Sequence, residues 1–364
     1  MIYLDNAATT PICEAARQAM IDHFDAYGNP SSSHELGRQA RALIEDARER
    51  IARCINATPE SIYFTSGGSE ANTWALHWHF VLSSPIEHHS IRLDHQFPVN
   101  NNGNIDPHEV SERIQLLRRQ DKYLTMVSCM HVNNEIGTIQ PVKEIAKVAH
   151  ACNLPFHVDA VQSVGHLPID VQNLECDFLS ASGHKFGAMK GTGFLFAKDD
   201  SQLIAFMNGG KQEQGKRPGT ENVIGILSMA AALEDAVVHM EARNNHIKYL
   251  RDKLLNKLLN ISGSYINGSL TERTVSNINI RFDGVSGSRL VTLCSLYGIY
   301  ISSGSACNEG VAAPSHVLKA IGLSDEEALN SIRITLNHQN TEKDIDIVAD
   351  IISALVRRIR NDEK

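Results

Sequence analysis

Short apolar runs alternate with helical stretches along the first part of this chain, and this alternation limits the possible folds more than any other feature. Residues 34–55 place Leu36, Ala40, Leu43, Ala47 and Ile51 at helical spacing. A second helix is expected over 141–152. Strands separated by helices predict a mainly parallel sheet with helices on both faces. The expected strands are 61–65 (SIYFT), 123–132 (YLTMVSCMHV), 155–161 (PFHVDAV), 176–182 (CDFLSAS) and 191–197 (GTGFLFA).

The rhythm changes after a long helical pattern that runs from about 221 to 262. Two further strands are expected over 274–282 and 298–304, followed by a last helix from Thr341, with Thr341 and Asp344 as a capping pair. A chain of 364 residues is long enough for two domains. We therefore predict a large domain, 14–244, and a small domain, 245–364, to which residues 1–13 also belong. The apolar stripe of the last helix consists of Ile345, Val348, Ile352, Leu355 and Ile359.

Charge and the start of the chain limit the possible partners. With 34 Lys and Arg against 42 Asp and Glu, the net charge is −8, which disfavours direct binding to nucleic acid or to a membrane surface. The opening MIYLDNAATT lacks a signal sequence, and no apolar run approaches membrane-spanning length. We expect a cytoplasmic protein.

The cysteines predict a reducing compartment. They are seven in number, irregularly spaced and without a C-x-x-C pair, which disfavours a disulfide framework or a metal site. Most lie among apolar or helix-forming neighbours, where a thiol behaves as a small hydrophobe. Cys307 differs, because it stands in SGSACNEG (303–310) between Gly304 and Gly310. We expect such a segment to present the thiol on a flexible loop.

Three strand ends carry residues that are suited to one cofactor. The first strand leads into TSGGSEAN (65–72), a glycine-rich turn that opens a helix and is suited to a phosphate. Asp159 lies at or near the end of the 155–161 strand, and Lys185 follows the 176–182 strand. Ligands of a parallel sheet bind where its strands end. A phosphate cradle, an acid for the pyridinium nitrogen and a lysine for the aldehyde together match pyridoxal 5'-phosphate (PLP).

The motifs of the chain resemble, in order, those of the aminotransferase-like cysteine desulfurases, and most closely the housekeeping type that supplies iron–sulfur clusters. The resemblance implies PLP fold type I, with a mainly parallel seven-stranded sheet in the large domain and a smaller α/β C-terminal domain. It also implies a homodimer that converts L-cysteine to L-alanine and a protein persulfide. The motifs that carry it are YLDNAATTP, GNPSSSH, TSGGSEAN, EHHSI, MHVNNEIGTIQP, HVDAVQ, SGHKFG, RPGTEN, SSGSAC and PSHVLKAIGLSDEEALNSIR.

The same resemblance implies a role for each matching residue. Lys185 would hold the cofactor, Asp159 would meet its ring nitrogen, and His88 would stack on the ring and assist proton transfer. Arg333 would clamp the substrate carboxylate. Asn134 and Gln162 would contact the ring hydroxyl. The phosphate would be held by Gly68, Ser69, Ser182 and His184, together with Thr220 from a second subunit.

Cys307 would be the sulfur carrier. Sulfur that leaves the substrate as a persulfide needs a second thiol to attack it, and that thiol must then carry its cargo outward to an acceptor protein. A loop between small residues permits both tasks.

Several positions depart from the family pattern, and they concern the sulfur acceptor more than the reaction. They are Met189, Lys211, Gln214, Asn308, Glu309 and the pair Asn337-His338. The pathway stays open among iron–sulfur assembly, tRNA thiolation and DNA phosphorothioation. Two alternatives also remain: a selenocysteine lyase or other PLP lyase of the same fold, and a degenerate non-catalytic subunit of a sulfur pathway.

Overall fold

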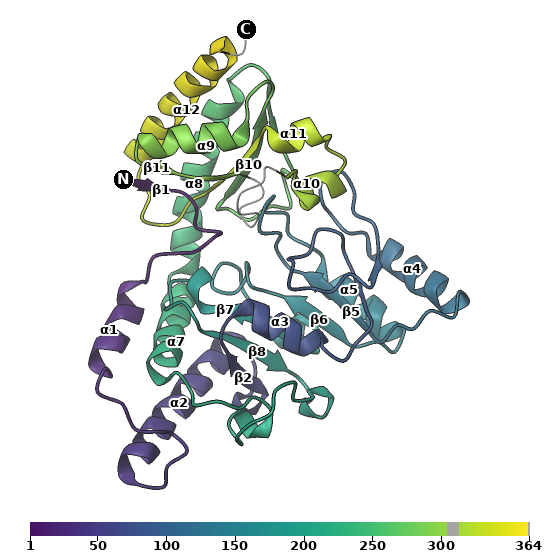
Figure 1. Cartoon of the computed structure of the whole chain (residues 1–364), viewed down its shortest axis with the longest axis vertical. Coiled ribbons are helices and arrows are strands. Elements are labelled where there is room, and N and C mark those ends of the chain that lie inside the picture. The colour runs from purple at the N-terminus through teal and green to yellow at the C-terminus, as the bar shows by residue number, and fades with distance from the viewer. Residues whose placement is uncertain (304–312, 363–364) are drawn as a thin grey trace.

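The computed structural model describes residues 1–303 and 313–362. Cys307 and Glu309 therefore lie outside the described residues. Figure 1 shows two bodies: a large sheet with its helices, and a smaller body that contains the last helix and lies beside the N-terminal strand.

The large sheet has seven strands, and most of its neighbours are parallel. The strands from β4 to β7 pair in parallel, whereas β8 runs antiparallel to both of its neighbours. The predicted α/β class and mainly parallel sheet are confirmed. Across the sheet the order is β2 (Ile62–Thr65), β8 (Gly193–Ala197), β7 (Phe178–Ser182), β6 (Phe156–Asp159), β5 (Met126–Met130), β3 (Val81–Ser83) and β4 (His95–Gln96).

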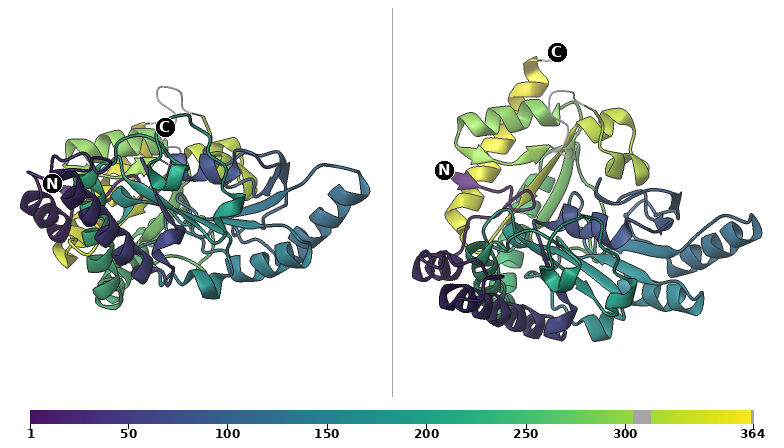
Figure 2. Two further views of the ribbon diagram at one scale, coloured as in Figure 1. Left: turned by 90° about the horizontal axis from the view of Figure 1, so that it is seen from below. Right: turned by 60° about the horizontal axis from the view of Figure 1, so that its bottom comes forward.

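Both faces of the large sheet are covered. Ile62 and Phe64 of β2 belong to one apolar cluster, whereas Tyr63 between them belongs to another, as the alternation of side chains along a strand requires. The second cluster includes α3 (Gly68–Leu76). In every view, α4 lies at the outer edge of the sheet, far from the N-terminus (Figures 1 and 2). The first cluster includes residues of α1 (Glu14–Asp22), α2 (Glu35–Cys54), α4 (Pro107–Arg119), α5 (Val142–Ala151), α6 (Val171–Leu174) and α7 (Val223–Val238).

The expected single long helix over 221–262 is wrong. It is two helices, α7 and α8 (Met240–Leu259), bent by 71°. The break falls at His239, and α7 contacts α1 and α2 whereas α8 contacts the last helix, α12 (Glu342–Asp362). No single helix among the described residues is long and apolar enough to cross a membrane, and only this bent pair, taken together, meets that criterion.

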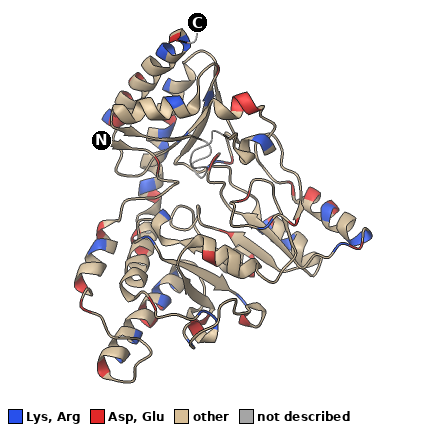
Figure 3. Cartoon of the chain, in the orientation of Figure 1, with Lys and Arg blue, Asp and Glu red and all other residues tan. Residues whose placement is uncertain are grey.

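The smaller body has a four-stranded antiparallel sheet. The predicted stripe of α12 is buried against it, and Thr341 and Asp344 cap that helix reciprocally. Figure 3 shows acidic and basic residues interspersed along α4 and α12. The order of the four-stranded sheet is β12 (Ser302–Ser303), β13 (Ser331–Thr335), β10 (Asn277–Phe282) and β9 (Ser264–Ile266). A separate pair is formed by β1 (Ile2–Tyr3) and β11 (Ile299–Tyr300). The remaining helices are α9 (Gly287–Leu296), α10 (His316–Ala320) and α11 (Asp325–Leu329). Short 3-10 turns are η1 (Pro59–Ser61), η2 (Gly183–Lys185), η3 (Asp200–Gln202) and η4 (Glu213–Gly215).

Candidate active site

A cavity of about 620 Å³ lies at the carboxyl ends of the large sheet's strands. Most of the residues predicted from the sequence line it, although they come from segments far apart in the chain. They are Gly68, Ser69, His88, Asn134, Asp159, Gln162, Ser182, His184, Lys185 and Arg333.

One wall of the cavity is the turn between β2 and α3. A side chain at Gly68 would place its Cβ 2.4 Å from Val161 Cγ2, so the approach of the two segments requires glycine. The first N–H groups of a helix have no partner within the helix. Together with the lining hydroxyls of Ser69 and Ser182, they form a set of donors suited to an anion.

Asp159 ends β6 inside the cavity and is almost fully buried. Its Oδ1 accepts a hydrogen bond from the Val161 N–H at 3.0 Å, and its Oδ2 accepts one from Asn72 Nδ2 at 2.7 Å. Burial raises the pKa of this carboxyl, while the two hydrogen bonds and the nearby His88 and Lys185 act against that rise. The sequence reasoning missed Asn72, which stands in the TSGGSEAN motif one helical turn after Gly68.

His88 lies at another side of the cavity. Its Nδ1 is 2.8 Å from Ser90 Oγ and accepts a hydrogen bond from the Ser90 N–H at 3.1 Å. Burial is the main cause that lowers the pKa of His88 below its ordinary value. Ser90 was also missed, although it belongs to the EHHSI motif.

Lys185 follows β7 in the short turn η2 and points at the N-terminal segment. Its Nζ donates to the carbonyl oxygens of Ala7 and Ala8 at 2.7 and 2.9 Å. His184 beside it contacts Thr9 Oγ1 through Nδ1 at 3.1 Å, and burial lowers the pKa of this imidazole to about 4. The first residues of the chain therefore form part of the cavity.

Arg333 reaches the cavity from β13 of the smaller body. Its Nη2 lies 2.8 Å from Asp5 Oδ1, and its Nη1 donates to the Asn134 carbonyl oxygen at 2.9 Å. Its Nε has no hydrogen-bond partner within the described part of the chain. The guanidinium is thus anchored by two of its nitrogens.

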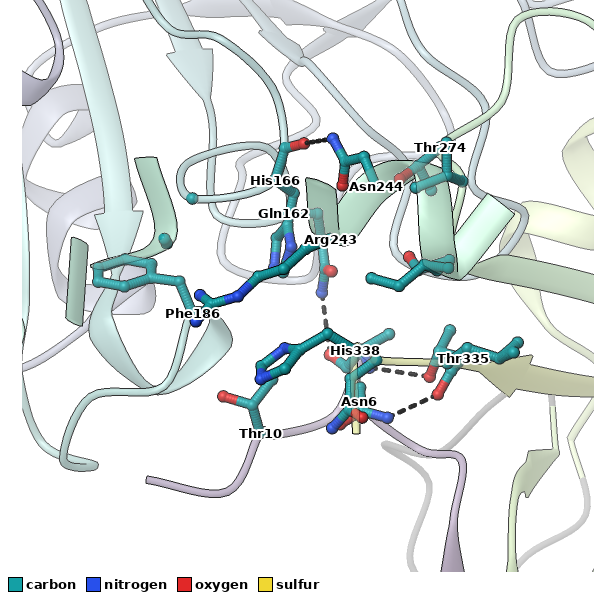
Figure 4. A pocket seen from close by; sticks show the side chains of 18 of the residues that line it. Asn6, Thr10, Gln162, His166, Phe186, Arg243, Asn244, Thr274, Thr335 and His338 are labelled. Atoms are coloured by element: carbon teal, nitrogen blue, oxygen red, sulfur yellow. Dashed lines mark hydrogen bonds between the residues drawn. The ribbon is translucent and has the colours of Figure 1, made fainter. Parts of the chain in front are cut away.

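Gln162 lies in the wall between this cavity and a smaller one of about 90 Å³. Its Nε2 donates to the Ala7 carbonyl oxygen at 2.9 Å (Figure 4). Asn337 and His338, where the chain departs from the family pattern, line the smaller cavity and not the larger one. Met189, Lys211 and Gln214 are likewise not among the described residues that line the larger cavity.

Thr220 is exposed and is not among the described residues that line the cavity. Its predicted role belongs to a second subunit and stays a prediction. The described cysteines are free, and each is half-buried or buried. Burial raises the pKa of the Cys54 thiol to about 11 and that of Cys176 and Cys294 to about 12. These thiols are therefore poor nucleophiles.

The aminotransferase class-V family model matches residues 2–348. The chain belongs to this family. A cysteine desulfurase IscS of Methanosarcina thermophila is 39% identical over 99% of this chain and 93% of its own length. The structure of a NifS-like protein from Rickettsia africae superposes with a TM-score of 0.90 at 32% identity, covering 98% of this chain and 99% of its own. A structure of SspA in complex with cysteine gives a TM-score of 0.79 at 32% identity, covering 94% of this chain and 100% of its own.

Members of this family are PLP-dependent, and the cavity fits that cofactor. The N–H groups at the start of α3, where only glycine fits at position 68, would suit a phosphate, and the buried carboxylate of Asp159 would suit a protonated ring nitrogen. Lys185 Nζ lies in the same cavity. The predicted PLP cofactor is therefore confirmed at the level of the family.

Proposed function

We propose that this cysteine desulfurase transfers the sulfur of L-cysteine to Cys307 as a persulfide and then to an acceptor protein. The carbon–sulfur bond of the substrate breaks, the sulfur joins the Cys307 sulfur, and the released carbon gains a proton to give L-alanine. The sum of one cysteine and one thiol equals one alanine and one persulfide, so no external oxidant or reductant is needed.

When bound, PLP withdraws electrons from the substrate's carbon skeleton and so weakens the bond to sulfur. In our proposal, Lys185 holds the cofactor and Asp159 keeps its ring nitrogen protonated. Asn134 and Gln162 contact the ring hydroxyl. The phosphate contacts are Gly68, Ser69, Ser182 and His184, with Thr220 of a second subunit.

Substrate binding is assigned to Arg333 and proton handling to His88. The anchoring of Arg333 by Asp5 and by the Asn134 carbonyl fixes the plane of the guanidinium, which suits a carboxylate that binds side by side. His88 is neutral near pH 7, because burial lowers its pKa, so it can accept a proton there.

The observation that carries the Cys307 assignment is the placement of the described residues on both sides of 304–312. Ser302 pairs with Arg333 in the register of β12 and β13. After the segment, Ser315 Oγ donates to Glu135 Oε2 at 2.5 Å, and His316 Nε2 contacts the carbonyl oxygen of Glu87 at 3.0 Å, next to His88. The chain thus enters and leaves the Cys307 segment beside the cavity.

Replacing Cys307 with serine tests this function. The variant should bind PLP as the parent does but form neither persulfide nor alanine at the parental rate, because an alcohol is a poor nucleophile at neutral pH. Alanine and alkylated persulfide are measured by mass spectrometry after addition of L-cysteine. Cys13→Ser, Cys54→Ser and the four buried-cysteine variants serve as controls and should retain turnover.

Three results would contradict the proposed function or its Cys307 assignment. Parental alanine production with persulfide on another cysteine would mean that Cys307 is not the carrier. Alanine production without any persulfide would favour the lyase alternative. A protein that neither binds PLP nor makes alanine would be the degenerate subunit.

We further propose a cytoplasmic homodimer that delivers sulfur to a partner protein of iron–sulfur assembly, tRNA thiolation or DNA phosphorothioation. Sedimentation of the holoenzyme tests the dimer, and a monomeric holoenzyme would contradict it. Loading with ³⁵S-cysteine and tracing the label into proteins encoded beside this gene identifies the acceptor.

A further inference from the structure

A chain of hydrogen bonds connects Asp159 to His88 through Asn72 and Ser90. Asn72 Nδ2 donates to Asp159 Oδ2 at 2.7 Å and to Ser90 Oγ at 2.9 Å. Ser90 Oγ in turn lies 2.8 Å from His88 Nδ1. Asn72 is only 1% exposed, so water does not compete for its hydrogen bonds.

The direction of each hydrogen bond follows from the chemistry of its groups. The Ser90 N–H donates to His88 Nδ1, which makes this nitrogen an acceptor. The Ser90 hydroxyl, which already accepts from Asn72, must therefore also donate to Nδ1. A neutral imidazole that accepts at Nδ1 carries its proton on Nε2.

The charged and titratable groups that face His88 come from several elements. Asp159 favours the protonated imidazole, whereas Lys185, His89 and His316 disfavour it. Burial also disfavours it and is the largest effect. Without the hydrogen bond from Asn72, the Ser90 hydroxyl could turn and accept a hydrogen bond from a protonated Nδ1, which would favour the charged form.

We propose that Asn72 and Ser90 are positioning residues that hold His88 as the Nε2–H tautomer and tie its ring to Asp159. The inference rests on the proposed function, in which Asp159 meets the cofactor and His88 handles a proton. The two groups then act from fixed relative positions. The lone pair of the neutral ring lies on Nδ1, where the two Ser90 donors already engage it, so these donors disfavour protonation of the ring. Asn72 determines the direction of the Ser90 hydroxyl and so sets the protonation of a ring that it does not touch.

Four variants separate this role from general packing. Asn72→Leu removes both amide donors at similar volume, and Ser90→Ala removes the hydroxyl. Ser90→Thr retains a hydroxyl and should restore parental behaviour. Thr73→Ala is the matched control, because Thr73 adjoins Asn72 on α3 but is exposed.

The first measurement is the ¹⁵N chemical shifts of the His88 ring nitrogens in the ¹⁵N-histidine-labelled holoenzyme, assigned by their loss in His88→Gln. The parent should show Nε2 protonated and Nδ1 as an acceptor. Ser90→Ala should change the tautomer ratio about fivefold, the effect expected for one hydrogen bond. Ser90 is half-buried in a turn, so this variant keeps the test decisive if Asn72→Leu does not fold.

The second measurement is the pH dependence of kcat/KM for L-cysteine. Asn72→Leu should raise the pKa of His88 and move the acidic limb of the profile to higher pH by about 0.5–1 unit. Thr73→Ala should leave it in place. A parent protonated at Nδ1, or parental shifts and profiles in both Asn72→Leu and Ser90→Ala, would overturn the proposal. If the parent makes no alanine, the proposed function fails, but the ring shifts still decide the tautomer.

Discussion

Single side chains in this protein acquire their chemistry from contacts with residues far away in the sequence. Lys185 is held by the carbonyl oxygens of Ala7 and Ala8, and Arg333 is held by Asp5. The N-terminal residues therefore orient both the proposed cofactor lysine and the proposed substrate arginine. Substitution of Lys185 should affect cofactor attachment, whereas substitution of Arg333 should affect substrate binding.

Lys185→Ala should abolish covalent attachment of the cofactor and lower turnover by about 10²-fold or more, because a cofactor that is not held covalently is less precisely positioned. Borohydride reduction followed by mass spectrometry measures the linkage, and alanine production measures turnover. Lys190→Ala is the control, since Lys190 lines the same cavity. A Lys185→Ala enzyme that still makes alanine at the parental rate would refute the assignment.

Arg333→Lys should raise KM for L-cysteine about 10–100-fold with a smaller change in kcat, because a lysine cannot offer two parallel N–H donors to a carboxylate. Steady-state kinetics check this. Arg281→Lys is a suitable comparison, because Arg281 lies on β10 and pairs with Glu327 outside the cavity. An unchanged KM in Arg333→Lys would remove Arg333 from substrate binding.

At the scale of elements, the two bodies are joined by helices that divide their contacts. The chain bends at His239 so that α7 contacts α1 and α2, while α8 contacts α12. The apolar stripe of α12 then covers the small sheet that carries Arg333. Packing of α12 should therefore govern the stability of the smaller body.

Ile352→Ala should destabilise the protein by about 2–5 kcal/mol, the cost of a cavity at a fully buried isoleucine. Ile347→Ala on the same helix should cost less than about 1 kcal/mol, because Ile347 is 37% exposed. Urea unfolding followed by circular dichroism measures both. Equal losses in the two variants would mean that α12 does not pack through the predicted stripe.

For the whole molecule, buried titratable groups make stability depend on pH. Burial lowers the pKa of His157 to about 3, and its ring nitrogens contact Ser128 and Ser180 inside the large sheet. The buried neutral ring therefore contributes fully to the free energy of unfolding above pH 6.5, the pKa of the unfolded state. This contribution is lost as the pH falls below 6.5. Glu87 acts in the opposite direction, because burial raises its pKa to about 8. Its contribution to the free energy of unfolding is fully present below pH 4.5, the ordinary pKa of the group, and is lost as the pH rises through about 8.

The parent should therefore lose up to about 1.4 kcal/mol per pH unit from His157 below pH 6.5. His157→Gln should show a shallower fall of the thermal midpoint between pH 6.5 and 5, whatever its midpoint at neutral pH. His108→Gln, at an exposed position, should keep the parental slope. Parental slopes in His157→Gln would show that His157 does not stay neutral in the fold.

The sequence by itself determined the fold class and, through the family resemblance, most of the site residues that line the cavity. Hydrophobic periodicity and residue chemistry are properties of short sequence segments. The apolar stripe of α12 and the candidate positions Asp159 and Lys185 could therefore be predicted from the sequence alone. Only the tertiary structure decided the bend at His239, the anchoring of Arg333 by Asp5 and the connection of Asp159 to His88 through Asn72 and Ser90. These depend on which strands become neighbours in the sheets and on where the two bodies meet, and hydrogen bonds between distant segments form only after that arrangement exists.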